Sequence, residues 1–341
     1  MSVPDGSPAR SRSRPRPLVA VTRDIPDAGL DIVRASCELR LWEGEMPPTP
    51  DELDALLDGV DGVLTLLDDK ITGAVLDAHP GIKVVSNYAV GYDNIDVAAA
   101  TERGVAVCNT PDVLNAATAE MSFALLMAAA RRITEAKDYI KEGHWHTWGP
   151  RVLLGQNVVG ATLGIVGFGR IGKRLAHMAS GFDMKLLVHS RTEDPEAARE
   201  FGATYVSLDE LLRQSDFVSL NVALTPETHH LIGKRELALM KPTAILVNAA
   251  RGRVVDTNAL LEALQAGTIT AAGLDVSDPE PLPADHPLVH LPNCVIAPHI
   301  ASATVETRNN MATMAASNLV AVLQGDRPAA IVNPEVLRAN A

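Results

Sequence analysis

The chain has 341 residues, of which 47% are hydrophobic and 21% are charged, and its formal net charge is −12. This length exceeds what one ordinary core fills, so the composition predicts a globular protein of two domains. The negative charge argues against nucleic acid as a partner, because phosphate contacts need a basic face. The longest uninterrupted apolar run, at residues 123–130, is too short to cross a membrane, so we expect no membrane partner.

The N-terminal segment differs from the rest of the chain. Residues 1–17 are rich in serine and proline and carry four arginines against one aspartate. Such a composition cannot bury apolar surface, so we predict a disordered, solvated tail at residues 1–17. A transit peptide is the alternative, but the prolines would break the helix that it requires.

The three cysteines are far apart in the sequence and have no metal-ligand spacing. We therefore expect no metal site. Cys37, Cys108 and Cys294 are predicted to be buried thiols of a protein in a reducing compartment, which favours the cytoplasm.

Short apolar runs alternate with helical patterns from the first predicted strand onward. In the first part of the chain, strands are predicted at residues 18–21, 60–67, 83–86 and 105–108, and helices at 51–57, 71–78 and 96–103. Alternation of this kind is typical of a parallel sheet with crossover helices. Residues 116–132 then predict one long helix that is apolar nearly all round and therefore buried.

A second alternation begins at Thr162. Its six predicted strands are residues 163–166, 185–188, 217–222, 244–248, 272–276 and 294–297, with helices at 171–180 and 258–265 among them. Six such strands indicate a doubly wound nucleotide-binding sheet. A last helix is predicted at residues 302–323. Ligand pockets occur preferentially between domains, so we expect a cleft there.

A glycine-rich motif follows the first strand of this second sheet and opens a helix. It consists of Gly167, Phe168, Gly169, Arg170, Ile171 and Gly172. The first glycine permits a tight turn, the second lets the backbone approach a pyrophosphate, and the third allows close packing of helix on strand. The helix N-terminus would then face the phosphates with its N–H groups. The motif therefore predicts dinucleotide binding, with a purely structural turn as the alternative.

The end of the next strand bears on the choice of cofactor. An NAD-preferring enzyme usually has a carboxylate there, whereas this chain has Ser190, Arg191 and Thr192. An arginine can pair with the 2′-phosphate of NADPH through charge-assisted hydrogen bonds. We therefore predict that NADPH is preferred and that NADH is possible. The alternative is that Arg191 is only a solvated surface residue.

Three residues suited to acid–base chemistry follow successive predicted strands. Arg251 offers a planar fork for a carboxylate, Glu280 could orient and charge a histidine, and His299 could move a proton. An isolated histidine is usually structural. Because all three lie where open α/β sheets place their ligands, we predict a catalytic group.

These motifs, in this order, resemble the D-isomer-specific 2-hydroxyacid dehydrogenases, and most closely their glyoxylate and hydroxypyruvate reductases. The resemblance covers about residues 18–335. The stretches that carry it include residues 87–96, 109–114, 190–192, 254–256, 273–276 and 298–300.

The resemblance implies two doubly wound parallel-sheet α/β domains with a cleft between them. Residues 116–302 would form the Rossmann cofactor domain, and residues 18–115 with 303–335 a flavodoxin-like substrate domain. It also implies a homodimer in which a tryptophan of the partner reaches the active site. Trp148 resembles that residue, although it could equally serve in packing.

The resemblance also implies residue roles. Arg251 would bind the substrate carboxylate, His299 would donate the proton to the carbonyl oxygen, and Glu280 would favour the imidazolium. Asp275 would hold the nicotinamide carboxamide. Further substrate contacts would come from Leu67, Val90, Gly91 and Trp148, and further cofactor contacts from Ala249, Ala250, His299 and Ala301.

The expected substrate is a small 2-oxo acid, glyoxylate or hydroxypyruvate. Within the same family, a 2-ketogluconate reductase or a phosphite dehydrogenase is the alternative. A third possibility is a binding protein like the NAD(H)-sensing corepressors, which can keep the three catalytic residues. The acidic charge and the reductase-like stretches favour the enzyme.

Overall fold

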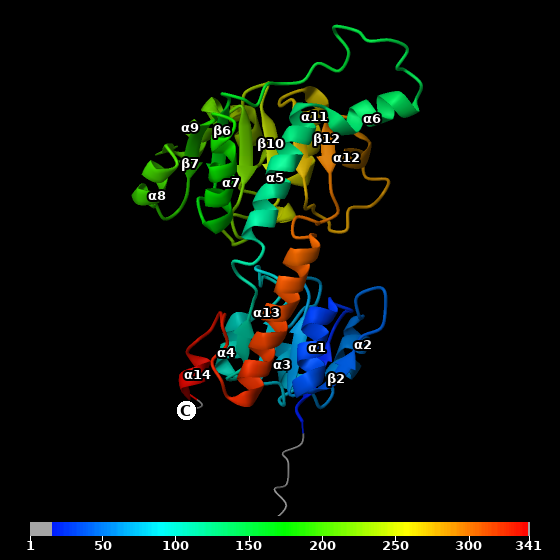
Figure 1. The fold of residues 1–341 in the computed structure, drawn as a ribbon, viewed down its shortest axis with the longest axis vertical. Coiled ribbons are helices and arrows are strands. Elements are labelled where there is room, and N and C mark those ends of the chain that lie inside the picture. The colour runs from blue at the N-terminus through cyan, green and yellow to red at the C-terminus, as the bar shows by residue number, and fades with distance from the viewer. Residues whose placement is uncertain (1–15, 340–341) are drawn as a thin grey trace, which may run out of the picture. The chain divides into compact units, whose positions relative to one another are not determined.

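The computed structural model describes residues 16–339, which form two compact units (Figure 1). The first unit combines the chain up to Thr110 with the segment from Asn309 onward, and the second runs from Pro111 to Arg308. The predicted tail at residues 1–17 lies, up to residue 15, outside the described residues. Its residue Arg16 donates a hydrogen bond to the carbonyl of Cys37 at 2.7 Å.

The first unit is built on a five-stranded sheet in which every strand pair is parallel. The strand order β2-β1-β3-β4-β5 is that of a flavodoxin-like doubly wound fold. The strands are β1 (Leu18–Val21), β2 (Glu38–Leu41), β3 (Gly62–Thr65), β4 (Val84–Asn87) and β5 (Ala106–Cys108).

The first unit also contains helices. They are α1 (Asp27–Ser36), α2 (Pro50–Leu57), α3 (Gly73–Ala78), α4 (Val97–Glu102), the part of α13 (Val305–Gln324) from residue 309 onward, and α14 (Val336–Ala339). Glycine allows α1 to lie directly against α13, because a Cβ at Gly29 would be 2.7 Å from the carbonyl oxygen of Ala312. The C-terminal helix α13 is thereby packed against the N-terminal helix α1.

The second unit contains a seven-stranded parallel sheet in the order β12-β11-β10-β9-β6-β7-β8. Its strands are β6 (Thr162–Val166), β7 (Lys185–His189), β8 (Ala203–Tyr205), β9 (Phe217–Leu220), β10 (Ile245–Asn248), β11 (Ala271–Leu274) and β12 (Cys294–Ile296). The order reverses between β6 and β9, and in open α/β sheets ligands bind at this switch point. The predicted fold class, with one Rossmann sheet and one flavodoxin-like sheet, is confirmed.

The second unit also contains helices. They are α5 (Asn115–Ala130), α6 (Ile133–Lys141), α7 (Arg170–Ser180), α8 (Pro195–Glu200), α9 (Leu208–Gln214), α10 (Lys234–Leu239), α11 (Thr257–Ala266) and α12 (Pro287–His290), with a short 3₁₀ turn η1 (Gly252–Val254). Helix α5 packs on α7 and on strands β10 to β12, as its apolar surface predicted (Figure 1). It ends before Arg132, which takes a left-handed conformation with φ of 54°.

Two strands differ from the sequence prediction. The second sheet has seven strands rather than six, because β8 was missed, and β2 was missed in the first sheet. Both are edge strands whose residues are exposed or half-buried, so neither has the apolar run that marks a central strand.

The cysteines were predicted to be buried thiols. All three cysteines are buried and unpaired, as predicted, and burial raises the pKa of the Cys108 and Cys294 thiols to about 12. Within residues 16–339, no helix is long and apolar enough to span a bilayer. In the same range, no three His, Cys, Asp or Glu side chains gather as a metal site would require.

Candidate active site

The glycine motif forms a turn that only glycine permits at two of its positions. Gly167 follows β6 with φ of +96°, and a Cβ there would lie 2.5 Å from the carbonyl oxygen of Asn221. A Cβ at Gly172 would lie 2.3 Å from the carbonyl oxygen of Gly167. The first glycine therefore makes the turn, and the last lets α7 pack against it.

The N-terminus of α7 is open in the way that a phosphate site requires. Gly169 is the N-cap and has no side-chain cap, and a Cβ built on it would meet no described atom within 4 Å. The first N–H groups of a helix lack partners within the helix and favour anions. Phe168 and Ile171 anchor the turn in the core, while Arg170 forms an ion pair with Asp112 at 3.1 Å. The residues present fit a dinucleotide pyrophosphate.

The end of β7 carries the predicted cofactor-selecting residues. Ser190 is half-buried, and Arg191 and Thr192 are exposed. A carboxylate lies near this arginine: a hydrogen bond with Thr225 lowers the pKa of Glu227, and the positive charge of Arg191 lowers it further. Sequence reasoning missed Glu227, which follows a different strand.

The turn after β10 is held by a buried amide. Asn248 donates from Nδ2 to the carbonyl of Arg251 at 2.9 Å and accepts from the N–H of Ala250 at 3.0 Å. Arg251 itself donates from Nη1 to the carbonyl of Ala250 at 2.9 Å. Asn248 thus shapes the turn of Ala249, Ala250 and Arg251. The one feature of the sequence that could have indicated this role of Asn248 is its position at the end of a predicted strand.

A second loop packs directly against this turn. A Cβ at Gly252 would lie 1.8 Å from the carbonyl oxygen of Ser277, so only glycine allows the approach. The hydroxyl of Thr257 donates to the carbonyl of Asp278 at 2.8 Å. The loop that carries Glu280 is therefore held beside Arg251 from two sides.

The structure brings Glu280 and His299 together. His299 Nδ1 and Glu280 Oε1 form a short hydrogen bond, and both side chains are partly exposed, at 28% and 37%. Burial raises the pKa of Glu280, but the hydrogen bond and charge of His299, with the charge of Arg251, outweigh it. The pKa of this carboxyl is therefore below its usual range. This side chain is an anion that can stabilise a positively charged imidazole.

Asp275 fixes the backbone around the histidine. Its carboxylate accepts from the N–H groups of Ile300 at 2.8 Å and Ala301 at 2.9 Å, and its carbonyl accepts from the N–H of His299 at 2.8 Å. His299 has a left-handed φ of 52°. Burial raises the pKa of Asp275, and the two N–H donors partly offset this. A carboxylate has about four acceptor positions, so each oxygen can take a further donor.

The remaining predicted contacts lie elsewhere in the chain. Leu67, Val90 and Gly91 belong to the first unit, in the loops that follow β3 and β4. The carbonyls of Val90 and Gly91 accept from Asn109 at 2.8 Å and Asn87 at 2.7 Å. Within residues 16–339, the backbone N–H groups of Val90 and Gly91 make no hydrogen bond. The loop after β4 is therefore fixed through its carbonyls.

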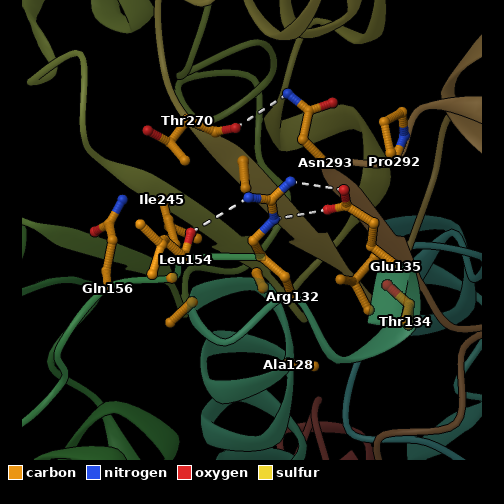
Figure 2. Close-up of a pocket in the computed structure, with 15 residues that line it drawn as sticks. Ala128, Arg132, Thr134, Glu135, Leu154, Gln156, Ile245, Thr270, Pro292 and Asn293 are labelled. Carbon is orange, nitrogen blue, oxygen red and sulfur yellow. Dashed lines mark hydrogen bonds and ion pairs between the residues drawn. The ribbon is translucent and has the colours of Figure 1, made fainter. Parts of the chain in front are cut away.

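A cavity of about 320 Å³ lies at the opposite edge of the second sheet (Figure 2). It is lined by residues at the N-terminal ends of β10 to β12, whereas Arg251 and His299 follow the C-terminal ends of β10 and β12. At its edge, Arg132 pairs with Glu135 at 2.6 Å and donates to the carbonyl of Leu154 at 3.3 Å. None of the predicted site residues lines this cavity.

Known proteins share this architecture. A family model described as "D-isomer specific 2-hydroxyacid dehydrogenase, NAD binding domain" matches residues 123–301. A curated glyoxylate reductase from Korarchaeum cryptofilum is 50% identical over 324 residues, which cover 95% of this chain and 98% of that protein.

Two solved structures show related proteins with different cofactors. An NADPH-dependent glyoxylate/hydroxypyruvate reductase from Sinorhizobium meliloti, in complex with NADP and malonate, is 32% identical with a TM-score of 0.82. The match covers 93% of this chain and 97% of that one. A D-lactate dehydrogenase from Aquifex aeolicus, complexed with NAD and lactic acid, is 28% identical with a TM-score of 0.81. That match covers 93% and 99% of the two chains.

The match to the family model spans more than half of the chain, and the curated relative is matched along nearly its whole length. The two parallel sheets and the open glycine turn agree with the similarity to these proteins. The chain therefore belongs to the D-isomer specific 2-hydroxyacid dehydrogenase family and is an NAD(P)-dependent oxidoreductase.

Proposed function

We propose that this protein reduces a small 2-oxo acid, either glyoxylate to glycolate or hydroxypyruvate to D-glycerate, with NADPH as the preferred cofactor. The observation that carries the proposal is the pairing of His299 with Glu280 on a loop packed beside Arg251. The 50% identity to a glyoxylate reductase supports the choice of substrate.

The roles of the three residues follow from their chemistry. The nicotinamide supplies a hydride for the carbonyl carbon when it is bound. His299 has Nδ1 engaged by Glu280, which leaves Nε2 as the nitrogen that delivers a proton to the carbonyl oxygen. Arg251 binds the substrate carboxylate with its planar fork. One hydride and one proton then convert the 2-oxo acid to the 2-hydroxy acid.

The first unit supplies the remaining substrate contacts in this proposal. The N–H groups of Val90 and Gly91 would bind the carboxylate, and Leu67 would limit the size of the substrate. We assign the substrate domain to residues 18–115 and 303–335, and the cofactor domain to residues 116–302.

The proposed NADPH preference rests on the end of β7. Ser190 places no negative charge near a 2′-phosphate, and Arg191 supplies a positive one. The proposed cofactor contacts also include Thr192, Ala249, Ala250, Asp275 and Ala301, with the glycine turn holding the pyrophosphate. Three unpaired, buried thiols support a reducing, cytoplasmic location.

We also propose a homodimer. Helix α6 has no buried residue, and the segment that begins with it exposes apolar side chains. These are Ile133, Ile140, Trp145, Trp148, Val152 and Leu154. Clustered exposed apolar residues mark interaction surfaces, and Trp148, at 81% exposure, is free to reach a partner. Analytical ultracentrifugation should find a dimer, and Ile140→Glu should weaken it.

A turnover assay with purified protein, glyoxylate and NADPH tests the proposal. We expect NADPH to be consumed and glycolate to be formed in equal amounts. Binding of NADPH without turnover of any 2-oxo acid would favour a sensing protein instead.

A further inference from the structure

Two loops follow neighbouring strands of the first sheet and are joined by buried amide side chains. One loop follows β3 and contains residues 66–69, and the other follows β4 and contains residues 88–94. Asn87 is the last residue of β4 and Asn94 belongs to the second loop, and their exposures are 0% and 5%. A buried amide is costly unless its donors and acceptors are satisfied, so their partners define their role.

Asn94 reaches from the second loop to the first. Its Nδ2 donates to the carbonyls of Leu66 at 2.9 Å and Asp69 at 3.0 Å. Its backbone carbonyl accepts from the N–H of Ile71 at 3.0 Å. One residue therefore holds both ends of the loop that carries Leu67.

Asn87 completes the connection on the other side. Its Nδ2 donates to the carbonyl of Gly91 at 2.7 Å and to Asn94 Oδ1 at 3.1 Å. Its Oδ1 accepts from the hydroxyl of Thr65 at 3.0 Å. The bond to Gly91 fixes the peptide that lies next to the substrate-facing N–H groups in our proposal.

The first loop is also anchored from β1. The carboxylate of Asp69 accepts from the N–H of Leu66 at 2.7 Å and from the hydroxyl of Thr22. Both Thr22 and Asp69 are buried. The network thus runs from Thr22, directly after β1, through both loops, and the side chains that link its parts are all buried.

These bonds are not needed to pair the strands. Strands β3 and β4 are already joined by their own register, from Gly62 with Val84 to Thr65 with Asn87. Asn94 lies outside any strand, and among residues 16–339 its side chain bonds only to loop carbonyls and to Asn87. What it fixes is the separation of the two loops.

We propose that Asn94 is a positioning residue that sets the distance between Leu67 and the Val90–Gly91 peptide, and thereby restricts the site to small 2-oxo acids. This inference rests on the proposed function, because it takes those residues as the substrate contacts. Asn94 acts through the loops and does not itself touch the substrate.

The test compares Asn94→Ala with a matched control, Asn333→Ala. Asn333 is also buried in the first unit and makes three hydrogen bonds, to Val107, Thr101 and Val105, which lie in or before β5. Both variants lose one buried amide, so a general loss of stability should affect both alike. Asn94→Ser keeps one hydroxyl donor and serves if Asn94→Ala does not fold.

Steady-state kinetics should separate substrate binding from cofactor binding. We expect Asn94→Ala to raise KM for glyoxylate about tenfold, because displaced binding groups bind the substrate less tightly. KM for NADPH should stay unchanged, and selectivity for glyoxylate over the bulkier 2-oxoisocaproate should fall. Asn94→Ser should lie between this variant and the unmodified protein, and Asn333→Ala should change the melting temperature only.

The outcomes distinguish this inference from the function beneath it. An unmodified protein that reduces no 2-oxo acid overturns the proposed function and the inference together. If the unmodified protein is active, three results overturn the inference alone. These are an unchanged glyoxylate KM and selectivity in Asn94→Ala, an equal rise in both KM values, and the same kinetic change in Asn333→Ala.

Discussion

At the scale of single residues, the contact between Glu280 and His299 bears on how the reductive activity depends on pH. The hydrogen bond and charge of His299 lower the pKa of Glu280, so its carboxylate stays charged throughout the neutral range. Replacing it with glutamine removes the charge that favours the imidazolium. We expect Glu280→Gln to move the alkaline fall of reductive activity to lower pH, measured as kcat against pH. A profile that does not move would mean that Glu280 has only a structural role.

His299 should be required for the chemical step and not for cofactor binding. General acid catalysis contributes roughly 10²–10⁴-fold, so His299→Ala should lower kcat by about that factor. Its side chain is partly exposed and its backbone is held by Asp275, so the variant should fold. Titration of the variant with NADPH, followed by fluorescence, should show binding as before. Near-normal turnover would exclude His299 as the acid.

The choice between NADPH and NADH should depend on Arg191. Charge-assisted hydrogen bonds contribute roughly 1.5–3 kcal/mol, so NADPH should lead NADH by about 10–100-fold in kcat/KM. A 2′-phosphate far from the reacting atoms would be bound alike in the ground and transition states, so the difference should appear mainly in KM. Arg191→Ala should remove most of the lead and leave NADH kinetics unchanged. Equal KM values for both cofactors in the unmodified protein would contradict this assignment.

Glu227 should weaken that preference. Its carboxylate interacts electrostatically with Arg191, so it should compete with a 2′-phosphate for the positive charge of Arg191. Both groups are exposed, so the competition is modest. Glu227→Gln should lower KM for NADPH about two- to fivefold and leave KM for NADH unchanged. A parallel change in both KM values would show that the effect is not on the 2′-phosphate.

At the scale of elements, we expect the contact between η1 and the loop that carries Glu280 to be essential for activity. A Cβ at Gly252 would overlap the Ser277 carbonyl, so Gly252→Ala must displace the loop. A misplacement of about 1 Å can cost about 10²-fold in rate, so we expect a loss of kcat of that order. Gly181→Ala is the matched control, since its new Cβ would come no closer than 3.5 Å to a neighbour. Equal activity in the two variants would contradict the role of this contact.

The strand–helix alternation could be predicted because central parallel strands are buried on both faces. Strands such as β3, β4 and β10 are buried throughout, and their apolar runs stand out in the sequence. Edge strands β2 and β8 lack this signal. Helix α6 was missed for a related reason, since none of its residues is buried.

At the scale of the whole molecule, candidate site residues that follow strand ends could be predicted from the sequence, but most of the bonds that hold their loops could not. Glu280 and His299 were placed together because both follow strands that end at one edge of the sheet. The bonds of Asn94 to Leu66 and of Thr257 to Asp278 join segments that only the folded chain brings together. No local pattern of residues encodes such contacts.

The most direct test of the central claim is the reduction of hydroxypyruvate by the unmodified protein with NADPH, followed by analysis of the product on a chiral column. The account predicts that D-glycerate is formed, one molecule for each NADPH oxidised. Formation of L-glycerate, or no oxidation of NADPH with either hydroxypyruvate or glyoxylate, would contradict it.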